Sequence, residues 1–423
     1  MNKKKVVIVG GGFGGILAAK NLKKDNLEVI VVDKTNHHLF QPLLYQVAAA
    51  ALSPGDIAVP IRSIFSGRYN IEIIMSEVLS VNKEESFVQL TDRKIYFDYL
   101  ILAPGSSHSY FGNDEWENYA PGLKTLDDAL SIREKILRSF EEAEILENKN
   151  LRERFLTFVI IGGGPTGVEM AGAIAEIAKQ TMLKDFRNLD PIETKIYLVE
   201  AGSRILPAYS EKLSSIAKKD LENMGVKVLV NTKVTNVSED GVTFGNEFIQ
   251  TRNIIWAAGN EASPLLKSLK IPLDRIGRVQ VKRDLSIENF PNIFVIGDAA
   301  YLTNENGEAL PGIAPVAMQQ GKYVAELIEN DLPFNQRKPF VYFDKGTMAT
   351  IGKAKAVAKI RNLEFSQMPA WFLWSFVHIF FLITFRNRFR VMAEWIWYYF
   401  TSRRGVRLIT THPEKKNFEK AAV

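Results

Sequence analysis

VVIVGGGFGGILAA, at residues 6–19, joins a β-branched run to a glycine-rich turn and the alanine-rich start of a helix. The β-branched run predicts a buried parallel strand, and Gly10, Gly12 and Gly15 have the spacing G-x-G-x-x-G. Gly10 would form the tight turn, Gly12 would let the backbone approach a pyrophosphate, and Gly15 would let the helix pack on the strand. The free N–H groups and the positive end of the helix dipole would then face the phosphates.

An acidic residue follows this turn at the distance expected for a dinucleotide site. The run at residues 29–32 predicts a second strand, which ends in Asp33, about 20 residues beyond the turn. A carboxylate there can accept hydrogen bonds from the hydroxyl groups of a ribose. Glycine-rich turns also occur as plain connectors, but the strand, the turn and the acid together favour a dinucleotide site over a βαβ unit without a ligand.

The same pattern returns at residues 158–169, which read FVIIGGGPTGVE. Gly162, Gly164 and Gly167 repeat the glycine spacing, and the next strand ends at Glu200, although the gap before it is longer than the standard spacing. One such unit can hold a flavin dinucleotide and the other a nicotinamide dinucleotide. The predicted fold class is therefore α/β, with two Rossmann-like dinucleotide-binding domains.

The composition excludes several classes of chemistry. The chain has 423 residues, of which 46% are hydrophobic and 24% charged, as is ordinary for a globular protein of more than one domain. It has no cysteine, so it has no thiol nucleophile and no redox-active cysteine pair. With only five histidines, we expect no metal site. The formal charge of +5 is mild for a nucleic-acid binder, and we expect no nucleic-acid partner, but it suits an anionic membrane surface.

A loop of mixed polar and apolar residues follows Asp33. It reads HHLFQPLLYQVA at residues 37–48 and has the period of neither a strand nor a helix. Loops at this place lie at the carboxyl edge of a parallel sheet, where ligands bind in α/β folds. We interpret His37 and His38 as a surface pair in preference to catalytic residues.

A later strand delivers Gly297 and Asp298 to the start of a helix. Gly297 permits a close backbone approach, and the Asp298 carboxylate can accept hydrogen bonds from sugar-type hydroxyl groups or cap a helix. A further predicted helix carries Gln319 and Gln320 beside small residues.

The C-terminal region differs in composition from the rest of the chain. Residues 370–385 are strongly apolar and aromatic, and as a helix they would span about 24 Å, short of the roughly 30 Å core of a bilayer. A second aromatic run follows at residues 395–400, and arginines lie beside both runs. This composition is typical of an interfacial membrane anchor, although a buried dimer interface or a core helix is the alternative.

With these features together, the chain resembles the type II NADH:quinone oxidoreductases, which are flavoproteins with two dinucleotide-binding domains. The resemblance covers nearly the whole length and rests on both glycine turns, the loop at residues 38–48, Gly297-Asp298, the Gln319-Gln320 helix and the aromatic tail. It implies an enzyme that passes hydride from NADH to FAD and then two electrons to a membrane quinone, without proton pumping. It also implies a homodimer bound peripherally, through membrane lipid, to the cytoplasmic face of the inner membrane.

The resemblance also implies a domain plan and a set of cofactor contacts. Residues 1–115 and 270–330 would form the FAD domain, residues 116–269 an inserted NADH domain, and residues 331–423 the membrane-anchoring region. Asp33 would bind the adenosine ribose of FAD, Asp298 its ribityl or phosphate region, and Glu200 the ribose of NADH, where it would disfavour a 2′-phosphate. Beside these acids and the glycines above, the expected cofactor contacts are Phe13, Gly14, Lys34, Gln41, Val78, Ala103, Gly105, Pro165, Thr166, Gly259 and Ala317.

Three residues are candidates for the quinone chemistry. Glu169 lies one turn past the second glycine set, where the first unit has the apolar Leu17. It would mediate protons for the quinone or, equally, complement the helix dipole. Gln319 and Gln320 are the other candidates. The family often reads A-Q-x-A-x-Q-Q at this helix, and here Pro315 replaces the first glutamine, so we carry over no quinone contact at that position.

Two other functions keep the double fold. A soluble NADH-dependent reductase of a small electron carrier would leave the aromatic tail unexplained, and a redox sensor would bind both dinucleotides without turnover. Disulfide reductases and sulfide:quinone oxidoreductases of this fold use thiols, so the absence of cysteine excludes both.

Overall fold

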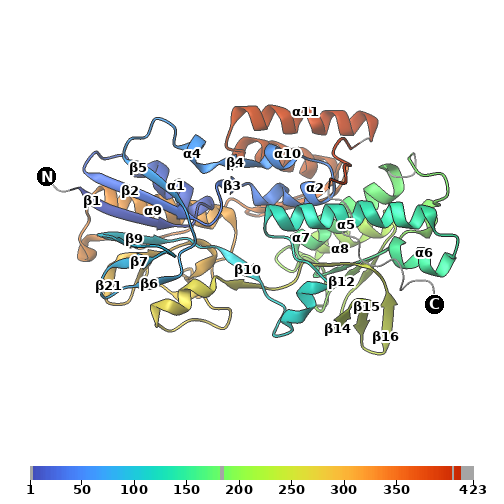
Figure 1. The fold of residues 1–423 in the computed structure, drawn as a ribbon, viewed down its shortest axis with the longest axis horizontal. Helices are drawn as coiled ribbons and strands as arrows, with labels where there is room; N and C mark the ends of the chain where they lie inside the picture. The colour runs from blue at the N-terminus through green and yellow to red at the C-terminus, as the bar shows by residue number, and fades with distance from the viewer. Residues whose placement is uncertain (1–2, 182–184, 403, 411–423) are drawn as a thin grey trace. The chain divides into compact units, whose positions relative to one another are not determined.

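The computed structural model describes residues 3–181, 185–402 and 404–410 (Figure 1). The chain divides into two compact units, and each is discontinuous in sequence. Unit 1 runs up to Phe40 and resumes at Ala58–Gly112 and Gly259–Gly346. Unit 2 comprises Gln41–Ile57, Asn113–Ala258 and the chain from Thr347 onward.

Unit 1 is built around a six-stranded sheet in the order β20-β21-β9-β1-β2-β5. Neighbouring strands from β21 to β5 pair in parallel, and the edge strand β20 pairs antiparallel with β21. The strands are β1 (Lys4–Val9), β2 (Leu27–Asp33), β5 (Ile71–Met75), β9 (Tyr99–Leu102), β20 (Ser286–Ile287) and β21 (Phe290–Val295).

Both faces of this sheet are buried, which explains the continuous β-branched run in β1. Val6 and Ile8 point to the face covered by helices α1 (Phe13–Asn21) and α9 (Ala314–Glu329). Val7 and Val9 point to the other face, where the small sheet of β6 (Ser80–Asn82), β7 (Phe87–Gln89) and β8 (Lys94–Tyr96) packs together with η6 (Pro264–Leu269). The alternation of side chains along a strand therefore supplies two separate cores.

The remaining short elements of unit 1 connect these layers. They are β3 (His37–Leu39), β4 (Ala58–Pro60), α4 (Ile61–Ile64), β10 (Ser106–His108), β18 (Asn260–Ala262), β19 (Val279–Gln280), η7 (Gly297–Ala299), β22 (Ala300–Tyr301) and η8 (Phe334–Gln336).

Unit 2 contains a four-stranded parallel sheet in the order β13-β12-β11-β17. This order repeats the order β5-β2-β1-β9 of unit 1, strand for strand, since β11 comes before its neighbours β12 and β17 in the chain, as β1 comes before β2 and β9. The prediction of two Rossmann-like domains is thus confirmed. The strands are β11 (Thr157–Ile161), β12 (Lys195–Val199), β13 (Val226–Leu229) and β17 (Asn253–Trp256).

Helices surround this second sheet. Thr125 begins α5 (Leu126–Ile145) with a capping box, in which its side chain and that of Asp128 satisfy each other's backbone N–H groups. The other elements are η1 (Gln41–Leu43), α2 (Leu44–Ala48), α3 (Pro54–Ile57), η2 (Asp114–Asn118), α6 (Lys149–Leu156), α7 (Pro165–Glu176), the π-helical turn η3 (Ile177–Thr181), η5 (Pro191–Glu193), α8 (Glu211–Asn223), β14 (Val234–Ser238), β15 (Gly241–Phe244) and β16 (Glu247–Gln250).

The C-terminal part of unit 2 is a three-stranded antiparallel sheet followed by two helices. Its elements are β23 (Thr347–Gly352), β24 (Lys355–Ile360), β25 (Leu363–Ser366), α10 (Gln367–Phe381) and α11 (Phe385–Thr401). The first aromatic run ends as a helix at Phe381, before the expected residue 385, because the Thr384 side chain caps a new helix by accepting from the Asn387 N–H. None of the helices in the described ranges combines the length and the apolar character needed to cross a bilayer.

Candidate functional site

The turn after β1 is a cradle of backbone groups at the start of α1. Gly10 has a φ of +103°, and a Cβ there would lie 2.1 Å from the Ala103 carbonyl oxygen. A Cβ at Gly15 would lie 1.9 Å from the Gly10 carbonyl oxygen, so helix and strand pack too closely for a side chain. At Gly12 a Cβ would meet no atom within 4 Å. The backbone at Gly12 therefore faces open space, as a phosphate at this helix start requires.

Asp33 is bound to the middle of the same turn. Its Oδ2 accepts from the Gly11 N–H at 2.5 Å, and its Oδ1 accepts from the Thr35 N–H and hydroxyl group at 2.7 Å each. An ionised carboxylate has about four acceptor sites, so Asp33 can hold the turn and still accept from a ribose. Lys34, beside it, is exposed.

The second turn repeats this construction in unit 2. Gly162 has a φ of +110°, and a Cβ at Gly167 would lie 1.8 Å from the Gly162 carbonyl oxygen. A Cβ at Gly164 would meet no atom within 4 Å. Pro165 is the first residue of α7, where its fixed φ suits a helix and its missing N–H costs nothing, and Thr166 next to it is exposed.

Glu200 takes the place in unit 2 that Asp33 has in unit 1. Its Oε2 accepts from the Gly163 N–H at 2.6 Å, and its Oε1 accepts from the Gly202 N–H at 2.6 Å. Although more residues precede Glu200 than precede Asp33, Glu200 lies in the same position relative to its turn, because the additional residues lie between α7 and β12. Both cradles fit a dinucleotide by the same geometry.

The other predicted cofactor contacts lie mostly in unit 1. Gly14 packs against Ile296 and Ala317, and a Cβ on Gly14 would lie 3.0 Å from the Ile296 side chain. The remaining residues of this group are Phe13 at the start of α1, Val78 between β5 and β6, Ala103 and Gly105 after β9, and Gly259 before β18. Gln41 belongs to unit 2, where its side chain donates to the Lys124 carbonyl oxygen.

Asp298 and Gln320 meet at the turn after β21. The Asp298 Oδ2 accepts from the Ser106 hydroxyl group at 2.7 Å, and the Gln320 Oε1 accepts from the Gly297 N–H at 2.7 Å. Gln320 is buried, so it holds the turn that presents Asp298. Gln319 exchanges two hydrogen bonds with the backbone of Phe343. Both candidate glutamines thus have backbone partners in this structure.

The interpretation of His38 as a surface residue is wrong. His38 is 2% exposed, its Nδ1 lies 2.9 Å from the Gly11 carbonyl oxygen, and its ring packs edge-on against Phe13. Burial lowers the pKa of His38 to about 4, so the ring is neutral at pH 7. The loop looked aperiodic because it consists of elements too short to show a period, such as β3 and α2. His38 therefore contacts the first cradle at Gly11 and Phe13.

Glu169 lines a cavity of about 70 Å³ inside unit 2. The wall is made by α2, α7, β23, α10 and α11 and by the segments that follow some of them. Its side chains with polar groups are Tyr45, Gln46, Glu169, Glu176, Thr350, Lys353, Trp371, Trp374, Glu394, Trp395, Tyr398, Tyr399 and Arg404.

The carboxyl group of Glu169 has a raised pKa. Burial raises the pKa of its carboxyl group to about 8, although the Thr350 backbone N–H, which bonds to the carboxyl group, opposes this rise. The group is therefore largely protonated at pH 7 and loses its proton just above. A carboxylate that complements the helix dipole is ionised, whereas Glu169 is largely neutral at pH 7.

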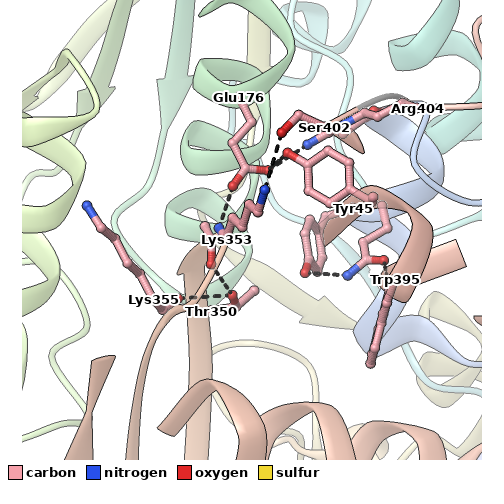
Figure 2. A network of polar contacts seen from close by, with 12 residues as sticks. Tyr45, Glu176, Thr350, Lys353, Lys355, Trp395, Ser402 and Arg404 are labelled. Carbon is pink, nitrogen blue, oxygen red and sulfur yellow. Dashed lines mark hydrogen bonds and ion pairs between the residues drawn. The ribbon is translucent and has the colours of Figure 1, made fainter. Parts of the chain in front are cut away.

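Glu176 and Arg404, which both line this cavity, form a buried ion pair (Figure 2). The Glu176 Oε2 accepts from the Arg404 guanidinium at 2.8 Å and from the Tyr398 hydroxyl group at 2.7 Å. Arg404 also donates to the Ala49 carbonyl oxygen, just after α2. The Lys353 N–H donates to the other oxygen of Glu176. Arg404 thus ties the segment after α11 to α7, the helix of Glu169, and to the turn after α2.

Sequence reasoning did not single out several of these residues. Glu176 lies seven positions after Glu169, two helical turns along one face of α7, and this spacing could have identified it. Tyr45 and Gln46 lie in the loop that we expected at a ligand. Trp395 and Arg404 carried no such signal, because the aromatic and arginine-rich tail was interpreted as a membrane anchor, with a dimer interface or a core helix as the alternative, and not as part of a site.

Comparisons with known proteins agree with this geometry. The sequence model of the pyridine nucleotide-disulphide oxidoreductase family matches residues 4–321, and that of the NDH2 C-terminal domain matches residues 345–404. Type II NADH:quinone oxidoreductase Ndh of Mycobacterium tuberculosis is 40% identical over 96% of this chain and 90% of its own. NdhA of the same organism is 41% identical over 97% and 90%. The structure of NDH2 from Plasmodium falciparum in complex with NADH has a TM-score of 0.87 at 22% identity, over 96% of this chain and 99% of that one.

Proposed function

The chain belongs to the type II NADH:quinone oxidoreductase family, and we propose that its two cradles divide the cofactor and the co-substrate of that reaction between them. It is an FAD-dependent enzyme that oxidises NADH and reduces a quinone without pumping protons. The observation that carries this function is that the chain has two such cradles. In each, an acidic side chain accepts a hydrogen bond from the N–H of the middle glycine of the turn. Because the chain has no cysteine, the two bound dinucleotides cannot serve a disulfide reductase reaction.

Unit 1 would hold FAD, which when bound takes up hydride from NADH and releases two electrons to the quinone. The Gly12 backbone has the open space that a pyrophosphate needs, and Asp33 retains acceptor capacity for the adenosine ribose. Asp298 would accept from the ribityl chain, in a turn that Gln320 holds. The domain boundaries at residues 115 and 270 stay a prediction.

Unit 2 would hold NADH on the second cradle. Glu200 would accept hydrogen bonds from the adenosine ribose, and its negative charge would repel the 2′-phosphate of NADPH. The Gly163 and Gly202 N–H groups fix both oxygens of this carboxylate, so the charge stays at one position.

Glu169 would supply a proton to the quinone. The overall reaction, NADH + H⁺ + quinone → NAD⁺ + quinol, takes up one proton from solution. A half-buried carboxyl group with a pKa of about 8 matches general acid catalysis near neutral pH. Gln319 and Gln320 stay predicted quinone-side residues. Their side chains also form hydrogen bonds with backbone groups, of Phe343 and of Gly297 respectively, and so support the local structure.

The enzyme is membrane-associated, and we propose that it binds the cytoplasmic face of the inner membrane peripherally through α10 and α11. Each helix buries one side, through Trp374 and Val391 for example, and exposes an aromatic stripe on the other. The exposed stripe consists of Phe372, Phe376 and Phe380 on α10 and Phe385, Phe389, Ile396, Trp397 and Phe400 on α11. A homodimer remains part of the proposal, and light scattering in detergent would test it.

A substrate comparison tests the function. The purified holoenzyme should oxidise NADH steadily with menadione, a naphthoquinone without an isoprenoid tail, and should not reduce an iron–sulfur carrier protein at a similar rate. Turnover with the carrier and none with any quinone would favour the soluble reductase. A yellow protein that binds NADH without turnover would favour the sensor.

A further inference from the structure

Tyr45 lines the same cavity as Glu169, and a chain of hydrogen bonds determines which way the proton of its hydroxyl group points. The Gln46 side-chain amide donates to the Tyr45 oxygen at 2.8 Å, and the Trp395 indole N–H donates to the Gln46 side-chain oxygen at 2.8 Å (Figure 2). Tyr45 and Gln46 are consecutive residues of α2, whereas Trp395 lies on α11. Tyr45 is 6% and Gln46 9% exposed, so this chain of hydrogen bonds is shielded from solvent.

Trp395 sets the order of donors and acceptors along this chain. An indole N–H can only donate, so it fixes the Gln46 oxygen toward itself and the Gln46 NH₂ group toward Tyr45. The Tyr45 oxygen must then accept from Gln46, and its own proton is left for another partner. Among the described residues no acceptor for this proton is found. The tyrosine proton is therefore available on the side of the cavity.

The cavity is also where an oxygen acceptor would arrive. Glu169, the proposed proton donor, lines the same space as Tyr45. The wall residues Trp371, Glu394 and Tyr399, on α10 and α11, are partly exposed, so the cavity reaches the surface beside the two helices with the aromatic stripe. Burial raises the pKa of Tyr45 well above its usual value. Tyr45 thus stays protonated and can give a hydrogen bond at any pH at which the enzyme works.

We propose that the Tyr45 hydroxyl group donates a hydrogen bond to a carbonyl oxygen of the quinone, and that Gln46 and Trp395 are positioning residues that aim it. This assignment rests on the proposed function and adds a specific substrate contact to it. Tyr45 keeps its proton, while Glu169 gives one up. The two groups therefore do different work on the substrate: one orients and polarises a carbonyl group, and the other protonates an oxygen.

The carbonyl stretch of a bound quinone tests the contact without turnover. Menadione labelled with ¹³C at its carbonyl carbons is bound to the oxidised holoenzyme, and its infrared bands are compared with those of free menadione. In the unaltered protein we expect one carbonyl band at lowered frequency. In Tyr45→Phe that shift is lost, and the dissociation constant, from calorimetry, rises about tenfold, the value of one net hydrogen bond.

Two further variants test the direction. Gln46→Glu at alkaline pH places two acceptor oxygens between Trp395 and Tyr45, so the tyrosine proton turns away from the cavity and the band shift is lost although Tyr45 is present. Trp395→Phe removes the donor that orders Gln46 and should broaden the band. Trp374→Phe is the matched control, because its ring centroid lies 5.1 Å from that of Trp395, with the rings tilted by 31°, but its indole N–H has no hydrogen-bond partner among the described residues. It should leave the band in place.

The outcomes separate this inference from the function itself. An unchanged band in Tyr45→Phe, or equal effects of Trp395→Phe and Trp374→Phe, overturns the assignment while NADH:quinone turnover stands. Unaltered protein that neither binds nor reduces menadione overturns both. Thermal unfolding shows whether each of the four variants is folded. If Tyr45→Phe does not fold, Gln46→Glu decides the question.

Discussion

Glu169 differs from the corresponding Leu17 of unit 1 in one respect that matters for catalysis, which is its proton. Its pKa of about 8 means that the acid form predominates below pH 8 and falls tenfold per pH unit above it. We therefore expect the rate constant for flavin reoxidation by menadione to be level near pH 7 and to decline through pH 8. Glu169→Gln should lower this rate about a hundredfold and remove the decline. Stopped-flow absorbance over about pH 6 to 10 measures both, and an unaltered profile in the variant would assign Glu169 to the helix dipole.

Glu200 offers a second prediction, on the choice of co-substrate. Glu200→Gln removes the charge that repels a 2′-phosphate but keeps an oxygen for the Gly163 N–H. The KM ratio of NADPH to NADH should fall about tenfold, equivalent to about 1.4 kcal/mol. Initial rates with the two nucleotides at fixed menadione give the ratio. An unchanged ratio would show that Glu200 does not read the ribose.

The residues that could be predicted from the sequence are those whose role is local. Gly10, Gly15 and Asp33 act within one βαβ unit, so their spacing alone indicates their geometry. The contact of Gln46 with Trp395 joins positions 349 apart, and no periodicity links them. His38 was placed on the surface for a related reason: a short strand buries it under a turn 27 residues earlier.

At the level of elements, α7 and β23 approach each other at Gly172. A Cβ there would lie 1.7 Å from the Ile351 carbonyl oxygen, so Gly172→Ala must push β23 away and with it the Thr350 N–H that bonds to Glu169. We expect a loss of about 1–3 kcal/mol in the free energy of unfolding. The pKa of Glu169 should rise further, since that N–H lowers it. Gly55→Ala is the control, because a Cβ at Gly55 meets no atom within 4 Å. Equal unfolding of the two variants would contradict this packing.

The ion pair of Glu176 and Arg404 fastens the C-terminal segment to α7. Both side chains are buried, at 7% and 3% exposure, so Glu176→Gln leaves a buried guanidinium without its counter-charge. A loss of roughly 3 kcal/mol in stability is expected. Thermal unfolding measures it, and adding Arg404→Met to Glu176→Gln should recover part of the loss. No recovery in the double variant would mean that Arg404 acts mainly through Ala49.

The elements themselves were largely predictable. Both parallel sheets were predicted from a β-branched run followed by a glycine-rich turn. Such a run indicates a parallel strand, because a strand that is buried on both faces does not alternate between polar and apolar residues. For the tail, the sequence favoured a membrane anchor over a buried interface or a core helix. Its helices also carry an inner face, with Trp374 and Val391, whose partners in the fold only the tertiary structure identifies.

At the scale of the whole molecule, the aromatic stripe of α10 and α11 is expected to hold the enzyme on lipid. Phe376→Ser together with Phe389→Ser should weaken binding to anionic vesicles about tenfold per residue, since each ring withdraws a large apolar area from water. Flotation of the holoenzyme with vesicles measures the bound fraction. Phe248→Ser is the control, as Phe248 on β16 is 53% exposed, compared with 68% for Phe376. Equal flotation of both variants would place the lipid contact elsewhere.

Whether the two cradles serve one electron path is best tested by an anaerobic titration of the purified protein. The account predicts a yellow protein whose flavin absorbance near 450 nm is bleached by one equivalent of NADH and restored by one equivalent of menadione. A colourless protein would contradict the assignment of FAD. A flavin that NADH bleaches and no quinone restores would contradict the assignment of the oxidant.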